Sequence, residues 1–230
     1  VALSKARTTE EYRQILMSSL EEYERLSRMI ENILFLARSD SKKQKLNLVP
    51  LSIPQEINEV LEYYDAVKEE KGISVTLSVK GVLYADKMLF RRALANVLSN
   101  AFQYTPVGGS ISIESRVVSD LKAQTLEPDN TQEEDPHQSA IEIIVTDTGI
   151  GVEAKDLPRI FDRFYRARKA RSAYSQGTGL GLSIVKSIME LHGGSIKVTS
   201  EPTSGTKVTL IFPAKTGLPA ISSVVEESGK

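Results

Sequence analysis

Apolar residues follow a helical period at the start of this chain and a strand period after it. Between residues 8 and 40, apolar or small side chains return with a seven-residue repeat, and Thr8 or Thr9 followed by Glu11 indicates the N-terminal cap of one long amphipathic helix. The apolar face is wide, so we expect it to pack in a helical bundle, either within its own domain or as a dimerisation helix. The repeat positions are Leu16, Ser19, Tyr23, Leu26, Ile30, Ile33 and Ala37.

From residue 46 onward, short alternating segments are separated by helical stretches and by Gly or Pro. Such a mixture predicts helices that cover one face of a mixed sheet, a two-layer α+β sandwich. The strands are expected at 46–53, 73–79, 82–84, 110–118, 140–146, 195–200 and 206–212, and the helices at 54–70, 86–105, 156–161 and 180–191.

Three segments follow neither period. Residues 119–139 are polar and acidic with two prolines, which predicts an exposed hairpin loop or, alternatively, a docking site for a partner. Residues 166–176 carry four basic side chains and little apolar content, which predicts a flexible basic lid. The tail from residue 216 lacks a pattern and is expected to be disordered.

Composition narrows the possible functions. The 230 residues carry 29 Lys and Arg against 30 Asp and Glu, so we expect no nucleic-acid partner. The absence of cysteine excludes disulfides and a thiolate nucleophile. Because the chain has only two histidines, we do not expect a zinc site built from histidines. No apolar run approaches the length of a membrane span. Because the chain begins at Val1 and already in a helical pattern, we interpret it as a fragment of a longer protein.

Two glycine clusters lie in the second half of the chain. The first follows an apolar strand and reads Asp147-Thr148-Gly149-Ile150-Gly151, and the second opens a helix and reads Gly177-Thr178-Gly179-Leu180-Gly181. Glycine lets backbone approach a ligand closely, and a glycine turn before a helix presents unpaired N–H groups to phosphate. Asp147 is an acceptor suited to an exocyclic amine. Taken singly, each cluster is equally consistent with an ordinary turn.

A pair of asparagines precedes both clusters. Asn96 and Asn100 lie four residues apart on the helix expected at 86–105, so both amides project from one face. Alone, such a pair is consistent with a solvent-facing surface. Here it comes with both glycine clusters and with the intervening Phe161-Asp162-Arg163-Phe164-Tyr165-Arg166. In this order the set closely resembles the ATP-binding domain of sensor histidine kinases, in the superfamily shared with Hsp90, gyrase B and MutL, over residues 48–213.

The resemblance implies a Bergerat-type ATP-binding fold preceded by a dimerisation helix. Residues 26–40 are similar to the second helix of the dimerisation hairpin in heavy-metal (copper, silver, zinc) sensor kinases. On this basis residues 1–45 form that second helix, with the first helix absent, residues 46–215 form the ATP-binding catalytic domain, and residues 216–230 form the tail.

The resemblance also implies a magnesium site and its chemistry. Asn100 is expected to ligate Mg²⁺ through its amide oxygen, with Asn96 assisting, and these two residues with Arg163 form the expected catalytic set. ATP-hydrolysing relatives place a glutamate at the position of Asn96 to activate water, and an amide is a poor base. Gln103 stands where the family often has a cationic phosphate contact, so lid residues are expected to supply that charge.

The nucleotide contacts follow from the same resemblance. Asp147 is expected to read the adenine amino group, Gly149 and Gly151 to let the base approach, Tyr104 to pack on adenine or ribose, and Thr206 to lie near the adenine. The phosphates are expected to meet Arg163, Arg166, Gly177, Thr178, Gly179, Leu180, Gly181 and Leu182. Gln103 belongs to the expected nucleotide-binding set but supplies no positive charge.

The implied activity is that of the catalytic part of a two-component sensor kinase. It binds Mg-ATP, phosphorylates a histidine on the missing helix, and supplies the phosphate for an aspartate of a cognate response regulator. We expect a homodimer formed through the hairpin and a cytoplasmic position beneath a bacterial inner membrane. Neither His137 nor His192 has the neighbours of an acceptor, and His192 is interpreted as a helix C-terminal residue placed favourably against the dipole.

Three alternatives stay open. One is an ATPase of the same superfamily, which Asn96 disfavours. A second is a nucleotide-binding but catalytically silent scaffold. The third is a plain dimerisation module in which the glycine clusters are structural turns.

Overall fold

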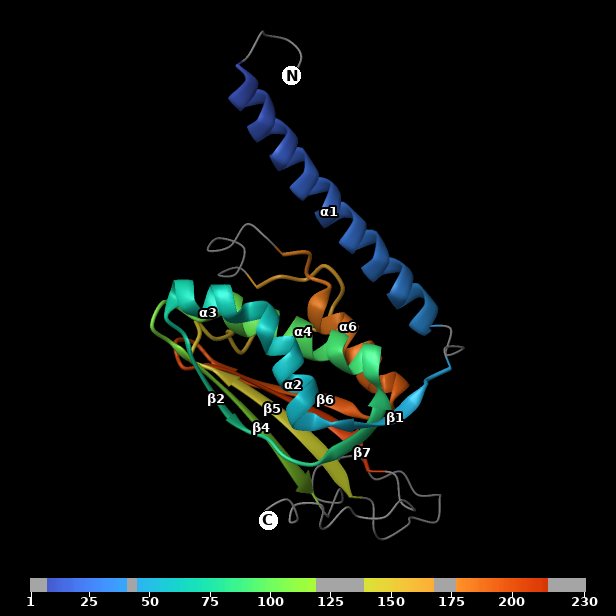
Figure 1. Cartoon of the computed structure of the whole chain (residues 1–230). Helices are drawn as coiled ribbons and strands as arrows, with labels where there is room; N and C mark the ends of the chain where they lie inside the picture. Colours follow the sequence, from blue (N-terminus) through green and yellow to red (C-terminus); the bar gives the residue numbers. More distant parts are fainter. Residues whose placement is uncertain (1–7, 41–44, 119–138, 168–176, 215–230) are drawn as a thin grey trace, which may run out of the picture. The chain divides into compact units, whose positions relative to one another are not determined.

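The computed structural model describes residues 8–40, 45–118, 139–167 and 177–214, and the chain divides into two compact units, Val1–Lys43 and Gln44–Lys230 (Figure 1). The predicted acidic loop, most of the predicted basic lid and the C-terminal tail fall outside the described ranges. Within those ranges, no helix combines the length and the apolar content needed to cross a membrane.

The first unit is built on α1 (Thr9–Asp40), which confirms the predicted amphipathic helix. Its N-terminus is capped reciprocally: Thr8 Oγ1 accepts from the Glu11 N–H at 3.3 Å, and Glu11 Oε2 accepts from the Thr8 N–H at 2.7 Å. Apolar side chains of the repeat remain open to solvent, with Leu16 69% and Tyr23 71% exposed. The helix therefore presents an apolar face that the single chain leaves exposed.

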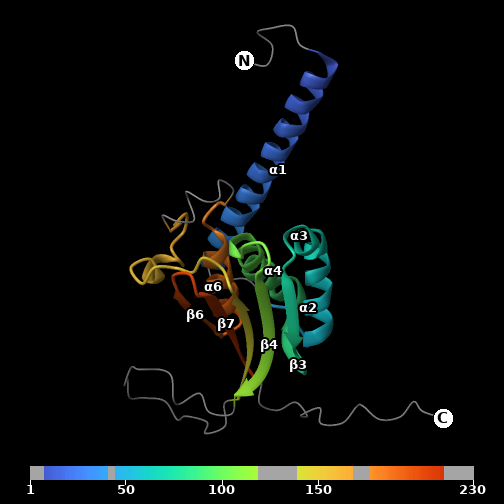
Figure 2. The same cartoon turned by 90° about the vertical axis from the view of Figure 1, so that its left-hand side faces the viewer.

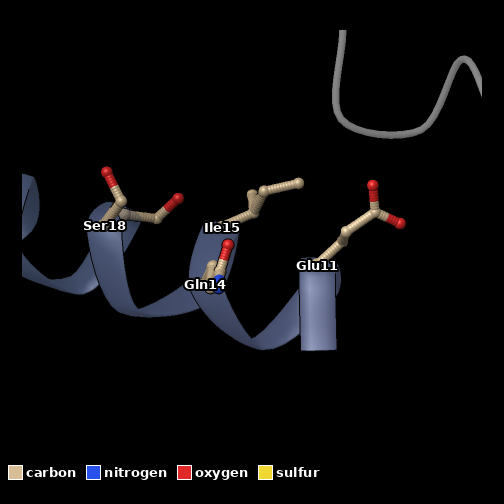
Figure 3. Close-up of a pocket in the computed structure, with 5 residues that line it drawn as sticks. Glu11, Gln14, Ile15 and Ser18 are labelled. Carbon is tan, nitrogen blue, oxygen red and sulfur yellow. The ribbon is translucent and has the colours of Figure 1, made fainter. Parts of the chain in front are cut away.

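A small hollow on α1 is lined by Glu11, Gln14, Ile15, Ser18 and Ser19 (Figure 3). These residues occupy successive turns of one helix, and Glu11 is already engaged in the N-terminal cap. The group brings no metal-ligand cluster or glycine turn together. We therefore assign no site to this hollow.

The second unit is built on a five-stranded sheet of order β2-β4-β5-β7-β6 and a separate two-stranded pair, β1-β3. In the larger sheet β2 runs parallel to β4, and the other pairs are antiparallel. The mixed sheet that the alternating segments predict is thus confirmed. The strand bounds are β1 (Leu48–Ser52), β2 (Ser74–Ser78), β3 (Val82–Asp86), β4 (Ser110–Val118), β5 (Ala140–Asp147), β6 (Ser195–Glu201) and β7 (Gly205–Pro213).

Helices cover one face of the five-stranded sheet (Figures 1 and 2). Leu94 and Leu98 of α4 and Ile184 and Ile188 of α6 are fully buried. Removing each such side chain from water stabilises the fold by about 1.5–3 kcal/mol before the entropy of ordering is counted. This layer confirms the predicted two-layer α+β sandwich. The helix bounds are α2 (Ile53–Leu61), α3 (Asp65–Lys71), α4 (Lys87–Tyr104) and α6 (Gly181–Leu191).

Two helix predictions were wrong in detail. The single helix expected at 54–70 is interrupted by a 3₁₀ turn, η1 (Glu62–Tyr64), before α3. At this interruption Tyr64 packs onto α4: its ring stacks on Phe102 with centroids 4.8 Å apart, and its hydroxyl donates to the Ala95 carbonyl at 2.9 Å. This tertiary contact lies at the break in the helix. A prediction from helix propensity does not include such contacts.

The helix expected at 156–161 is also shorter than predicted. It is reduced to the 3₁₀ turn η3 (Leu157–Arg159), with Pro158 inside it and no N–H to extend the ladder. Tyr165 then folds back on this turn. Its hydroxyl donates to Asp156 Oδ1 at 2.8 Å, and the Arg159 guanidinium lies over its ring at 4.3 Å from the centroid.

His192 joins the C-terminal end of α6 to the N-terminal end of α4. Its Nε2 accepts from the Asp86 N–H at 3.0 Å, so its Nδ1 carries the proton and donates to the Ile188 carbonyl at 2.8 Å. Asp86 in turn caps α4 through the Leu89 N–H at 3.1 Å. His192 does lie at a helix C-terminus as predicted, but burial lowers its pKa, although the Ile188 hydrogen bond and the charge of Asp86 act in the opposite direction. The neutral ring is the form that this junction requires.

We predict that this junction makes stability depend on pH. Because the pKa of His192 is lower in the folded chain than in the unfolded chain, its contribution is present above the unfolded pKa and is lost as the pH falls through the folded pKa. Chemical denaturation between pH 8 and about pH 5 should show the free energy of unfolding falling, and His192→Gln should flatten this dependence.

Asp147 and Glu56 also titrate in acid, so the difference between the parent chain and His192→Gln at each pH isolates the histidine. Burial raises the pKa of Asp147, whereas for Glu56 the hydrogen bonds from Arg91 and Lys87 outweigh burial and lower the pKa. Both contributions are common to the two proteins and cancel in the difference. A difference that does not change with pH would contradict a neutral His192 in the native state.

Candidate functional site

Asp147 closes β5 with a carboxylate that is 7% exposed. Its Oδ1 accepts hydrogen bonds from the Gly149 N–H at 2.8 Å and from the Thr206 N–H at 3.2 Å. Burial raises the pKa of this carboxyl, and the two N–H groups offset part of that effect because they favour the charged form. Neither bond uses Oδ2, so that oxygen remains able to accept from a ligand.

The glycines near Asp147 are required by the packing of the protein backbone itself. A Cβ on Gly149 would lie 2.6 Å from Asp147 Oδ1 and 2.8 Å from the Tyr104 carbonyl oxygen. Gly151 and Gly205 both have positive φ, and a Cβ there would overlap the carbonyls of Glu201 and Asp147 respectively. These positions therefore bring three chain segments into contact around one carboxylate. The predicted role of Gly149 and Gly151 in admitting a base stays a prediction.

Hydrogen bonds join the loop after Asp147 to its neighbours on both sides. The Ile150 N–H donates to the Tyr104 carbonyl at 3.3 Å, which connects the loop to the C-terminal end of α4. The Thr203 N–H donates to the Ile150 carbonyl at 2.9 Å, which connects the loop to the β6–β7 turn. Asp147, Gly149, Gly151, Tyr104 and Thr206, predicted to surround the base, are thus brought together.

Asn96 faces the N-terminus of α6. Its Nδ2 donates to the Arg92 carbonyl at 2.8 Å, and its Oδ1 lies 3.1 Å from the position that a Cβ on Gly181 would take. A side chain larger than hydrogen at Gly181 would therefore press on the amide oxygen. Asn100 lies one helical turn further along α4, and its amide makes no hydrogen bond to other residues that the structure describes. The helix that carries the asparagines and the glycine turn before α6 therefore meet at Asn96 and Gly181. The predicted roles of Asn96 and Asn100 at a metal stay predictions.

The start of α6 presents backbone N–H groups that no side chain caps. Thr178 Oγ1 accepts from the Leu180 N–H at 3.3 Å, and Ser183 Oγ donates to the Leu180 carbonyl at 2.8 Å. No side chain caps the helix, so its first N–H groups point out of the N-terminus, where the helix dipole favours negative charge. Leu182 lies in this first turn.

The aromatic-basic segment packs against the same glycine turn. Gly179 has φ +70°, and a Cβ there would lie 2.7 Å from the Phe164 carbonyl carbon. The Arg166 guanidinium comes within 3.4 Å of the position of a Cβ on Gly177. Arg166 is therefore placed beside the turn, whereas Arg163 is exposed and Gln103 is half-buried. The phosphate roles of these three residues stay predictions.

Sequence reasoning did not single out Ser200. This residue continues the inward alternation of Ile196 and Val198 along β6, and its hydroxyl lies 2.9 Å from Thr206 Oγ1. The sequence signal that could have identified it is a serine at a position of β6 where the strand alternation predicts an apolar, inward-facing residue. This serine places a third polar side chain in the row that contains Asp147 and Thr206.

The curated relatives include the sensor protein IrlS of Burkholderia pseudomallei, 44% identical over 214 residues, and the sensor protein CzcS of Cupriavidus metallidurans, 40% identical over 213 residues. Each alignment covers 93% of this chain, but 42% of IrlS and 41% of CzcS. The chain thus spans about two fifths of the length of these relatives.

Solved structures share the fold. Full-length ShkA in complex with AMPPNP superposes with a TM-score of 0.69 at 24% identity, covering 92% of this chain and 41% of that one. The Acinetobacter baumannii histidine kinase AdeS superposes with a TM-score of 0.67 at 20% identity, covering 91% of this chain and 86% of that one.

Residues 85–216, which include α4, both glycine clusters and β7, match the family described as histidine kinase-, DNA gyrase B-, and HSP90-like ATPase. This match covers more than half of the 230 residues. The chain therefore belongs to the histidine kinase-, DNA gyrase B- and HSP90-like ATPase family.

Proposed function

We propose that this chain is the catalytic part of a sensor histidine kinase. It binds Mg-ATP and transfers the γ-phosphoryl group to a histidine on a dimerisation helix outside these 230 residues, from which an aspartate of a response regulator takes it. The observation that carries the proposal is the amide of Asn96, whose oxygen faces the N-terminus of α6 where the ATP-hydrolysing relatives have a carboxylate base.

Nucleotide binding divides between two groups of residues. At the base, Asp147 Oδ2 accepts from the adenine amino group while Oδ1 stays bonded to the protein backbone. At the phosphates, the N–H groups at the start of α6 and the guanidinium of Arg166 meet the negative charge. Because the Asp147 carboxylate is held by two backbone N–H groups before the ligand arrives, little ordering is needed at the base.

Asn100 and Asn96 are the residues that would hold Mg²⁺. The described residues contain no group of three His, Asp or Glu side chains that would enclose a cation. An amide oxygen fits a Mg²⁺ ion that keeps waters and phosphate oxygens in its shell. Asn100 leaves its amide free of hydrogen bonds to the described residues, as a ligand position requires. When bound, the ion would neutralise negative charge on the phosphates of the nucleotide.

The chemistry then depends on an external nucleophile. A neutral imidazole nitrogen attacks the γ-phosphorus, the bond to the β,γ-bridging oxygen breaks, and ADP leaves with the electron pair. Asn96 does not take a proton from water, because its amide does not titrate usefully. The γ-phosphoryl group therefore survives in the site until the histidine arrives.

The helical unit supports the same proposal. The exposed apolar face of α1 fits a homodimer formed through a helical hairpin, and the relatives are named sensor proteins. We infer a cytoplasmic catalytic unit of a bacterial inner-membrane protein and a cognate response regulator as partner. One relative is named the sensor histidine kinase CusS. The two competing functions are a catalytically silent scaffold and an ATPase. The two experiments below distinguish them from a kinase.

The first prediction of the proposed function concerns nucleotide binding. Calorimetry with a non-hydrolysable ATP analogue should give micromolar-range affinity, about −7 to −8 kcal/mol, for the parent chain. Asp147→Asn should weaken it by at least about tenfold, because a charged acceptor for the adenine amine is lost. Asn100→Ala should bind the analogue with an affinity that no longer depends on Mg²⁺. Glu114→Gln, an exposed change on β4, is the matched control. A folded parent chain that binds no nucleotide would contradict the proposal.

The second prediction separates transfer from hydrolysis. Given radiolabelled ATP and a separate helical hairpin with an acceptor histidine, the parent chain should form acid-labile phosphohistidine and release little phosphate. Asn96→Asp places an isosteric carboxylate in the site and should raise phosphate release by about tenfold or more. Asn58→Asp, on the exposed surface of α2, is the control. Steady phosphate release by the parent without hairpin labelling would favour the ATPase.

A further inference from the structure

Ser200, Thr206 and Asp147 form one row across three neighbouring strands. Asp147 of β5 is paired with Thr206 of β7, and Thr206 is paired with Ser200 of β6, so the three side chains lie on the same face of the sheet. The hydroxyl oxygens of Ser200 and Thr206 are 2.9 Å apart. Asp147 and Thr206 bound the proposed base site, so the state of the Thr206 hydroxyl matters to any ligand there.

The hydrogen-bond partners of Ser200 decide where its proton lies. Ser200 Oγ is 2.7 Å from the Gly205 carbonyl oxygen, which only accepts, so the serine proton is donated there. The Val152 N–H, which only donates, lies 2.9 Å from the same oxygen and occupies one of its lone pairs. The contact with Thr206 Oγ1 must then use the remaining lone pair of Ser200. Thr206 is therefore the donor in that contact.

This assignment leaves the edge formed by Thr206 and Asp147 with acceptors only. The single hydroxyl proton of Thr206 is directed at Ser200, and the Thr206 N–H is donated to Asp147 Oδ1. What Thr206 Oγ1 and Asp147 Oδ2 still offer to a ligand is lone pairs. A 6-amino purine donates into such an edge, whereas a 6-oxo purine brings a carbonyl oxygen against it.

We propose that Ser200 is a specificity-determining positioning residue, which selects ATP over GTP by holding the Thr206 hydroxyl as an acceptor. The proposal rests on the proposed function, because it assumes a purine at Asp147. Without the serine oxygen, the Thr206 hydroxyl is free to rotate and to donate to a guanine carbonyl. The selection then weakens although no residue that touches the base has changed.

A purely structural role for Ser200 makes a different prediction. Ser200 also joins Val152, next to Gly151, to Gly205 at the start of β7. If it acts only as this brace, its loss loosens the loop and weakens ATP and GTP by the same factor. The ratio of the two affinities therefore separates the two roles, where the ATP affinity alone does not.

The experiment is calorimetric titration of the chain with non-hydrolysable ATP and GTP analogues. The parent should prefer ATP, and Ser200→Ala should lower the ATP-to-GTP affinity ratio about tenfold, the effect of about one hydrogen bond. Ser200→Thr keeps a hydroxyl and should restore the ratio. Thr199→Ala, an exposed neighbour on β6, should leave it unchanged. If Ser200→Ala is unfolded at the assay temperature, Ser200→Cys replaces it, because a thiol fills similar space and accepts weakly.

A double-mutant cycle tests whether Ser200 acts through Thr206. In a Thr206→Val background there is no hydroxyl to orient, so adding Ser200→Ala should not change the ATP-to-GTP ratio. An equal loss for both nucleotides in Ser200→Ala, or an undiminished effect in the Thr206→Val background, would overturn the specificity role. If the folded parent binds neither analogue, the proposed function itself fails, which is a distinct result.

Discussion

The structure around the candidate site depends on one carboxylate oxygen. Asp147 Oδ1 receives N–H groups from the loop that follows it and from the strand beside it, at Gly149 and Thr206. The chain can approach this oxygen so closely only because Gly149 and Gly205 lack side chains. The cost of burying a charge is thereby offset by hydrogen bonds from rigid backbone. The second oxygen is left in a fixed orientation, which is what a recognition group requires.

Helix α4 carries the other half of the site and is held at both ends. At its N-terminus, Asp86 caps it and is itself joined to α6 by His192. At its C-terminus, Lys71 Nζ donates to the carbonyls of Phe102, Gln103 and Thr105 at 2.7, 3.3 and 3.3 Å. A cation there also complements the helix dipole. Asn96 and Asn100 therefore project from a helix with little freedom to shift.

The sequence predicted much of this arrangement because its signals were local. The seven-residue repeat of α1 and the strand expected at 110–118 each depend on a few neighbouring residues, and both were confirmed. The break at Tyr64 was missed because its cause lies on α4, far along the chain. The neutral state of His192 was likewise hidden, since burial and the Asp86 N–H come from the tertiary fold.

In the candidate site, too, some features follow from local sequence and others follow only from tertiary contacts. The order of the motifs along the chain predicted Asp147 and the glycines near it as candidate site residues. It did not reveal that other backbone segments pack against these glycines and leave no room for a side chain. Ser200 carries no motif, and its role follows only from counting donors and acceptors around its hydroxyl. A sequence states which groups are present, whereas the direction of each proton is set by contacts between strands.

Recognition and chemistry are consequently separable in this fold. Under the proposed function, the edge formed by Asp147 and Thr206 selects the base, and the start of α6 holds the phosphates, without either group activating water. Under the same proposal, the amide of Asn96 takes the position of the base that would otherwise hydrolyse the nucleotide. Control of the reaction then passes to the arrival of the nucleophile. A signalling protein needs this separation, because ATP must wait in the site without being hydrolysed until the acceptor is presented.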